Sequence, residues 1–101
     1  MTPLSSSQRK YLRGLAHHLD PVVLVGKPGL SENLVQSALQ ALDAHELIKV
    51  RFNEFKDQKK ALAEELATRT GSQIAGIIGH VAILYRPQPD EDKRKIFLPQ
   101  N

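Results

Sequence analysis

Hydrophobic and polar positions along the 101-residue chain follow two periods, and each change of period marks a new element. Over residues 4–19 the apolar side chains recur at helical spacing on one stripe, which predicts an amphipathic helix. Ser5, with Gln8 three positions later, has the pattern of a capping box, and Asp20-Pro21 ends the helix because the residue before proline avoids helical geometry. The stripe consists of Leu12, Leu15, Ala16 and Leu19.

The next three elements are predicted from shorter patterns. Residues 22–25 (Val-Val-Leu-Val) form a wholly apolar run, which fits a strand buried on both faces in a sheet with parallel character. Ser31 is placed to cap a second helix over residues 32–45. Residues 47–52 alternate between apolar and polar side chains, which predicts a half-buried strand.

The remaining pattern completes an α/β topology. A third helix is predicted over residues 57–70, with Gly71 as its C-terminal stop. Two strands follow, 73–78 and 81–86, and the Gly79-His80 pair between them indicates a type II′ hairpin turn. The order α-β-α-β-α-β-β predicts an α/β (α+β) fold, with a four-stranded mixed sheet, packed helices and right-handed crossovers.

A chain of this length forms one domain, which we place at residues 1–87. Residues 88–101 are rich in charge and proline, include the run Lys93-Arg94-Lys95, and are predicted to form a charged, mobile tail. The end of this tail, Ile96-Phe97-Leu98, is a candidate to dock back on the domain.

Composition excludes several classes of protein. The chain has no cysteine, which excludes disulfides, thiolate catalysis and cysteine-based metal sites. The longest uncharged apolar stretch, residues 74–84, is too short to span a bilayer, and residues 1–7 lack the apolar core of a signal peptide. We therefore expect a cytoplasmic monomer with no membrane contact. The net charge of +3 favours an anionic partner only modestly.

The loop Gly26-Lys27-Pro28-Gly29 lies between a predicted strand and a predicted helix. Its glycines allow a ligand to approach the backbone closely, and the following helix points free N–H groups toward the loop. With Lys27, these groups form an anion site suited to phosphodiester oxygens, although a tight strand-to-helix connection has the same pattern. Pro28 has no N–H, so the site depends more on Lys27 and on the helix N-terminus.

Cationic side chains on neighbouring elements extend this candidate RNA-binding surface. Three of them gather on one side of the first helix, and Lys49 and Arg51 alternate outward on strand 47–52, which suggests a sheet face left open for an anionic partner. Taken singly, such cations are more often ordinary solvated surface. The predicted RNA-binding residues are Gly26, Lys27, Pro28, Gly29, Arg9, Lys10, Arg13, Lys49 and Arg51.

Aromatic and catalytic residues narrow the interpretation further. The chain has only two Tyr, three Phe and no Trp, so recognition of RNA backbone and shape is favoured over a sheet of stacking aromatics. Phe55, in a polar loop beside Lys56, is a candidate to stack on a base. No nucleophile elbow, zinc signature or carboxylate cluster is visible, so we expect no enzymatic activity, catalytic residue, metal or cofactor.

Several separated motifs also occur in the order of a known family. They are Leu15-Ala16-His17, residues 21–26, residues 26–30, residues 45–50, Ile78-Gly79 and residues 84–87. On these motifs the chain resembles the CRM domain (chloroplast RNA splicing and ribosome maturation) in its stand-alone bacterial and archaeal form, the YhbY-like proteins.

The resemblance implies a fold similar to the C-terminal domain of translation initiation factor three. It also implies RNA binding through Gly26 to Gly29, and association with rRNA of large ribosomal subunit precursors during ribosome assembly. Lys49 lies inside a matched motif, but its contact role is inferred from its position on the strand. The alternative function is a protein-interaction module that reaches the ribosome through a ribosomal protein.

Overall fold

The described chain begins with a short helix that packs across a sheet. The computed structural model describes residues 2–100. Helix α1 (Ser6–Ala16) starts after Ser5, whose hydroxyl accepts a hydrogen bond from the Gln8 N–H while the Gln8 side chain accepts one from the Ser5 N–H. The predicted capping box is therefore confirmed. The helix ends three residues earlier than predicted, because the Leu19 N–H donates to the Ala16 carbonyl in a closing turn.

Four strands form one mixed sheet in the order β1-β2-β4-β3. Strand β1 (Val23–Val25) runs parallel to β2 (Leu47–Phe52), and β4 (Val81–Tyr85) is antiparallel to both β2 and β3 (Gln73–Ile78). The predicted four-stranded mixed sheet is confirmed. The prediction that the first strand is buried on both faces is wrong, since β1 lies at the edge of the sheet and Leu24 is 56% exposed.

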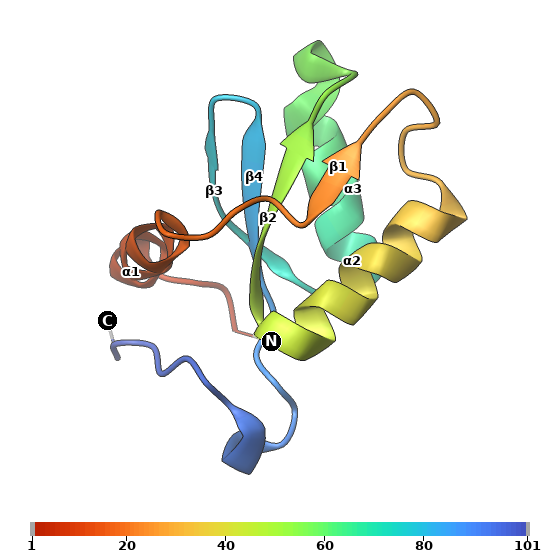
Figure 1. Ribbon diagram of the computed structural model, residues 1–101. Helices are drawn as coiled ribbons and strands as arrows, with labels where there is room; N and C mark the ends of the chain where they lie inside the picture. Colours follow the sequence, from red (N-terminus) through yellow and green to blue (C-terminus); the bar gives the residue numbers. More distant parts are fainter. Residues whose placement is uncertain (1, 101) are drawn as a thin grey trace.

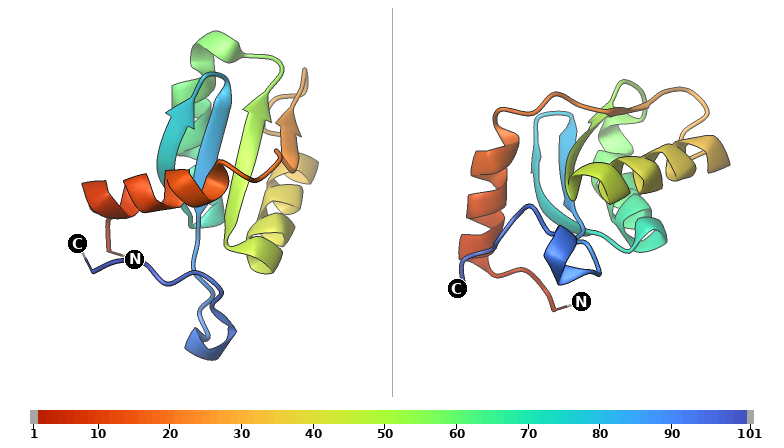
Figure 2. Two further views of the ribbon diagram at one scale, coloured as in Figure 1. Left: turned by 60° about the vertical axis from the view of Figure 1, so that its left-hand side comes forward. Right: turned by 60° about the horizontal axis from the view of Figure 1, so that its bottom comes forward.

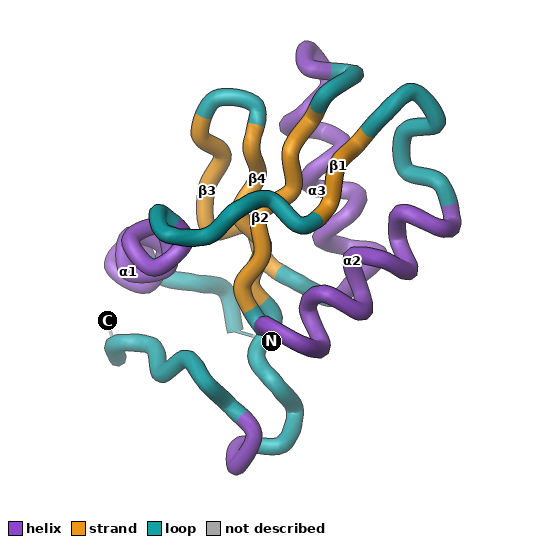
Figure 3. Tube along the Cα trace, viewed as in Figure 1, coloured by secondary structure: helices purple, strands orange, loops and turns teal. Residues whose placement is uncertain are grey.

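Helices cover the two faces of the sheet unequally. Helices α2 (Glu32–His45) and α3 (Lys59–Thr70) pack on one face, where most of the core lies, and α1 packs on the other (Figure 1). The larger core includes Leu42, Leu66 and Phe52, all fully buried. Figure 3 shows the strands between these helical layers.

Helix α1 leaves part of its face of the sheet uncovered. In the left view of Figure 2, α1 crosses the strands near the beginning of β2, and the strand ends toward the β3–β4 turn remain open. Leu24 and Ile78 (59% exposed) are apolar residues of this open half. The predicted stripe of α1 is correspondingly narrow, because only Leu12 and Ala16 are buried while Leu15 and Leu19 remain partly exposed.

Turns occur close to the predicted positions. A short 3-10 helix, η1 (Lys56–Gln58), precedes α3, so the third helix begins as a tighter turn. Gly71 ends α3 with φ of 68°, and Gly79 in the hairpin has φ of 59°, the positive value that the first turn residue of a type II′ hairpin requires. None of the helices within residues 2–100 is long and apolar enough to cross a membrane.

The C-terminal segment folds back on the domain around a buried carboxylate. It contains the short helix η2 (Glu91–Lys93), and its Ile96 and Leu98 pack against the smaller core under α1. The fully buried Glu46 side chain accepts hydrogen bonds from three backbone N–H groups of this segment, at 2.6 to 3.1 Å. These donors belong to Gln88, Lys95 and Ile96. Glu46 therefore anchors the segment that the sequence predicts as a mobile tail.

Candidate nucleic-acid interface

The loop Gly26-Lys27-Pro28-Gly29 is a tight turn between β1 and α2. The Gly29 N–H donates to the Gly26 carbonyl at 2.9 Å, and Gly29 is buried with φ of 69°. Lys27 and Pro28 form the exposed tip. Because the Gly29 N–H is used inside the turn and Pro28 has none, the loop offers a ligand fewer backbone donors than a glycine-rich cradle. The ammonium of Lys27 is therefore the main hydrogen-bond donor that the exposed tip of the loop offers.

The two glycines play different conformational roles. Only glycine adopts the left-handed conformation of Gly29 without strain. Gly26 does not have such a φ, and a Cβ built there would lie 3.9 Å from the Pro28 Cδ, an ordinary contact. The turn thus explains why residue 29 is glycine, whereas nothing in the packing requires glycine at residue 26.

The start of α2 is held firmly beside this turn. The Ser31 hydroxyl accepts a hydrogen bond from the Leu34 N–H at 3.2 Å, which confirms the predicted cap. Arg69 of α3 donates to the Leu30 carbonyl at 3.3 Å and pairs with Glu32 at 3.4 Å. These contacts connect the first residues of α2 to α3 and fix the direction in which the helix N-terminus points.

A second loop lies next to the first. Residues 25 and 52 are partners in the parallel β1–β2 pair, so the segments after both strands emerge at one edge of the sheet. The N–H groups of Asn53 and Glu54 both donate to the Val25 carbonyl, at 3.0 and 3.1 Å. A ring carbon of Phe55 lies 3.5 Å from the position that a Cβ on Gly29 would occupy. The GKPG turn and residues 53–56 therefore form one continuous surface (Figure 1).

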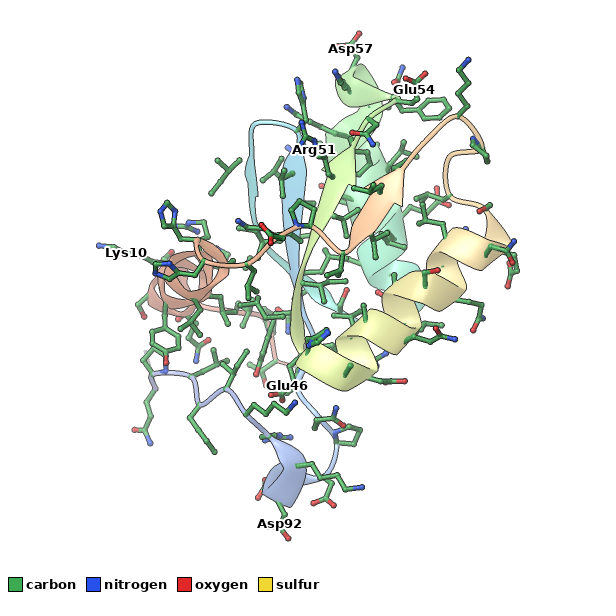
Figure 4. All side chains as sticks on the ribbon, viewed as in Figure 1. Lys10, Glu46, Arg51, Glu54, Asp57 and Asp92 are labelled. Carbon is green, nitrogen blue, oxygen red and sulfur yellow. The ribbon has the colours of Figure 1, made fainter. Side chains whose placement is uncertain are left out.

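This two-loop surface brings together cations that are far apart in the sequence. Lys27 and Lys56 are both exposed, and neither ammonium has a hydrogen bond or ion pair among residues 2–100. Two exposed carboxylates, Glu54 and Asp57, flank Lys56 at the same end of the molecule (Figure 4). Negative charge therefore offsets the positive charge around Lys56.

The strand cations occupy different settings although they share a face of β2. The Lys49 ammonium donates to the Leu19 carbonyl at 2.9 Å, so it also holds the α1–β1 connection in place. Arg51 is exposed in the open half of the sheet, beside Leu24 of the parallel strand, and it has no partner among the described side chains (Figure 4). The predicted open face is thus real around Arg51 and closed nearer to α1.

The three predicted cations of α1 lie apart from the loop. The Arg9 guanidinium donates to the Leu4 carbonyl at 2.7 Å and to the Ser6 hydroxyl, and that of Arg13 donates to the Ala75 carbonyl at 3.1 Å. Lys10 is exposed and points away from the sheet (Figure 4). The structure therefore does not gather all nine predicted residues into one site. The loop and the helix are separated by the open sheet face that carries Arg51.

Tyr85 has a shifted pKa, and it lies on β4 away from these loops. Burial raises the pKa of Tyr85 above its ordinary value of 10.0, the nearby Glu46 carboxylate raises it further, and Arg94 opposes the shift. Tyr85 belongs to the smaller core under α1. Within residues 2–100, no group of three His, Asp or Glu side chains is arranged to hold a metal ion.

Comparison with known proteins assigns the chain to a family. The model of the CRS1/YhbY (CRM) domain matches residues 4–86. An RNA-binding protein of Haemophilus influenzae is 40% identical over 101 residues, covering 99% of both chains. Probable RNA-binding protein YqeI of Bacillus subtilis is 36% identical, over 95% of this chain and 99% of its own.

A solved structure agrees with this assignment. A Staphylococcus aureus protein determined in solution superposes with a TM-score of 0.80 and 40% identity, covering 95% of this chain and 99% of its own. The match of sequence and fold extends over nearly the whole domain. The chain belongs to the CRS1/YhbY (CRM) domain family.

Proposed function

We propose that this protein binds RNA by gripping the sugar–phosphate backbone at the two-loop surface formed by residues 26–29 and 53–56. The observation that carries the proposal is the unpaired Lys27 at the tip of a braced turn, in a family whose relatives carry RNA-binding names. A fixed turn with a free ammonium suits phosphate, because the backbone that carries the cation is already ordered and the ammonium gives up no protein partner when an anion binds.

Three groups contribute to the proposed contact. The Lys27 ammonium binds a phosphate oxygen, and Gly26, which has no side chain, lets the chain of phosphates approach the backbone. Arg51 adds a second positive point on the open half of the sheet. Contacts of this kind provide affinity with little dependence on base sequence, so the protein recognises the position and shape of an RNA.

The proposed target is rRNA of large ribosomal subunit precursors, with the protein acting as a cytoplasmic monomer in ribosome assembly. This target follows from the family resemblance, and the loop chemistry is compatible with it. The mechanism needs neither a cofactor nor a catalytic residue, because holding an RNA conformation requires binding alone.

Charge reversal at the loop tip tests the proposal. Lys27→Asp with Pro28→Asp changes only exposed positions, so we expect the thermal unfolding midpoint to stay near that of the native protein. RNA affinity should fall by roughly tenfold or more, because one phosphate contact is lost and two repulsive charges are added. Pro89→Asp with Lys93→Asp introduces the same residue types at exposed positions of the C-terminal segment and serves as the control. Unchanged RNA affinity in the loop variant would refute the proposal.

The rival function, docking to a ribosomal protein, predicts a different response to salt. Direct binding to single-stranded RNA should weaken with a log–log slope of about 0.7 per phosphate contact. Fluorescence anisotropy with purified RNA at several salt concentrations measures this slope. A flat response, together with binding to a ribosomal protein, would favour the rival.

A further inference from the structure

Phe55 is a large apolar side chain that the core does not use. It lies in the loop between β2 and η1 and remains 42% exposed, while Phe52, three residues earlier, is completely buried. Residues 53–58 line an open hollow of about 520 Å³ around it. A single exposed apolar side chain is common on protein surfaces, so the interest of Phe55 lies in its backbone conformation and in its position beside the turn.

The backbone of Phe55 is held in an unfavourable conformation. Its φ is 56°, in the left-handed region that bulky residues rarely adopt. Hydrogen bonds fix the chain on both sides, because Asn53 and Glu54 donate to Val25 and the Gln58 N–H donates to the Phe55 carbonyl at 3.0 Å. Strained residues persist where the surrounding structure overrides their preference, and such positions cluster at binding sites.

The ring is positioned against the phosphate-binding turn. Its Cε2 and Cζ atoms lie 3.5 and 3.8 Å from the Cβ position of Gly29, so the end of the ring contacts the last residue of the turn. Because Phe55 is still 42% exposed, an aromatic side chain lies at the surface directly beside the proposed backbone contact.

The charges next to the ring are mixed, because Lys56 follows it in the chain and two carboxylates lie on either side of this pair. Glu54 and Asp57 are exposed carboxylates on either side of residues 55 and 56 and repel a phosphate approaching from that direction (Figure 4). Lys27 attracts phosphate at the exposed tip of the neighbouring turn. An RNA strand whose phosphate is held near Lys27 can place its uncharged base over Phe55 without this repulsion.

We infer that Phe55 is a base-stacking platform, and that the two-loop surface takes an unpaired nucleotide of single-stranded RNA. The inference rests on the proposed function, since it assumes that the turn holds the backbone. A base inside a duplex is already stacked on its neighbours and cannot reach the ring. Stacking is tolerant of base identity, so Phe55 selects single strands without selecting a sequence.

Substitution of the ring separates stacking from phosphate binding. Phe55→Leu retains an apolar contact to Gly29 but removes the aromatic face, and Phe55→Tyr restores that face. The probes are a labelled 12-nucleotide oligouridine and a blunt 12-base-pair RNA duplex, each titrated at one fixed salt concentration. Phe97→Leu makes the same exchange at a ring that is 72% exposed in the C-terminal segment, and thermal unfolding checks that each variant folds.

We expect Phe55→Leu to weaken binding of the single strand about tenfold, the scale found for loss of one stacked base. Phe55→Tyr and Phe97→Leu should bind the single strand as the native protein does, and duplex binding should be unchanged in all three variants. Equal single-strand affinity in Phe55→Leu and the native protein, or tighter native binding of the duplex, would overturn the inference. Neither result bears on the proposed phosphate contact. That proposal is refuted only if the acidic loop variant binds RNA as tightly as the native protein.

Discussion

Gly29 and Gly26 have different roles in the loop, so replacing each by alanine should change a different property. Stability should fall for Gly29→Ala, and RNA affinity should fall for Gly26→Ala. Gly29→Ala places a Cβ on a residue with φ of 69°. The left-handed conformation costs an L-residue roughly 1–2 kcal/mol. The new methyl group would lie 3.5 Å from the Phe55 ring, an ordinary contact that adds no clash. For a domain of this size, that cost corresponds to a fall in the unfolding midpoint of roughly 4–16 °C.

Gly26→Ala is predicted to behave in the opposite way. Its methyl group would be 3.9 Å from Pro28, and its backbone lies outside the left-handed region. Replacing glycine by alanine at a compatible position leaves stability unchanged or raises it by up to about 1 kcal/mol, because the unfolded chain loses freedom. RNA affinity should nevertheless fall about tenfold, the scale of one hydrogen bond to a charged phosphate.

Urea unfolding followed by circular dichroism, combined with RNA binding by anisotropy, measures both quantities for each variant. Gly29→Ala should lose stability, whereas Gly26→Ala should lose affinity at native stability. Equal destabilisation of the two variants would show that the turn geometry is wrong. Native affinity in Gly26→Ala would show that the backbone at residue 26 is not approached by RNA.

Three further predictions concern other parts of the molecule. Arg51→Gln should lower RNA affinity and reduce the salt slope by about 0.7. Arg9→Gln should change stability more than RNA affinity, because the Arg9 guanidinium donates to the Leu4 carbonyl. Anisotropy at several salt concentrations compares the two variants. Glu46→Ala leaves three partly buried N–H groups without their acceptor, so we expect a loss of about 3 kcal/mol and faster tryptic cleavage at Lys93 to Lys95. Native cleavage rates would contradict this expectation. Because burial, and then Glu46, raise the pKa of Tyr85, the folded state favours the protonated phenol. The free energy of unfolding is therefore unaffected below about pH 10 and falls as the pH rises through the folded pKa. Tyr85→Phe should remove this fall, which urea unfolding at about pH 9 and 11 measures.

Much of the fold could be predicted because its elements carry strong local patterns. Helical spacing, the Ser5 and Ser31 caps and the glycines at residues 71 and 79 placed the helices and turns within a few residues. The exposure of Leu24 could not be predicted, because an apolar run does not reveal whether a helix covers both faces of the sheet at that strand. The same apolar pattern fits a strand buried on both faces and an edge strand with one face open to solvent.

The site was predictable in part, for a related reason. The loop motif is local and visible in the sequence, whereas the contact between Phe55 and Gly29 joins residues 26 positions apart. It follows from the parallel register of β1 and β2, which brings the ends of both strands to one edge. Charge alone does not show that the guanidinium groups of Arg9 and Arg13 already donate to backbone carbonyls, so the sequence could not reveal these contacts. Glu46 gave no signal at all, since its three donors come from residues more than forty positions later.

RNA is proposed to contact the protein at residues 26–29 and 53–56, and amide chemical shifts are the most direct measurement of this contact. Titration of uniformly ¹⁵N-labelled protein with a 12-nucleotide oligouridine reports on every residue except proline. We expect the amide signals of Gly26, Lys27, Gly29 and Phe55 to shift first and furthest, with smaller shifts at Arg51. Shifts confined to α1 or to the C-terminal segment, with those loop amides unmoved at saturation, would contradict it.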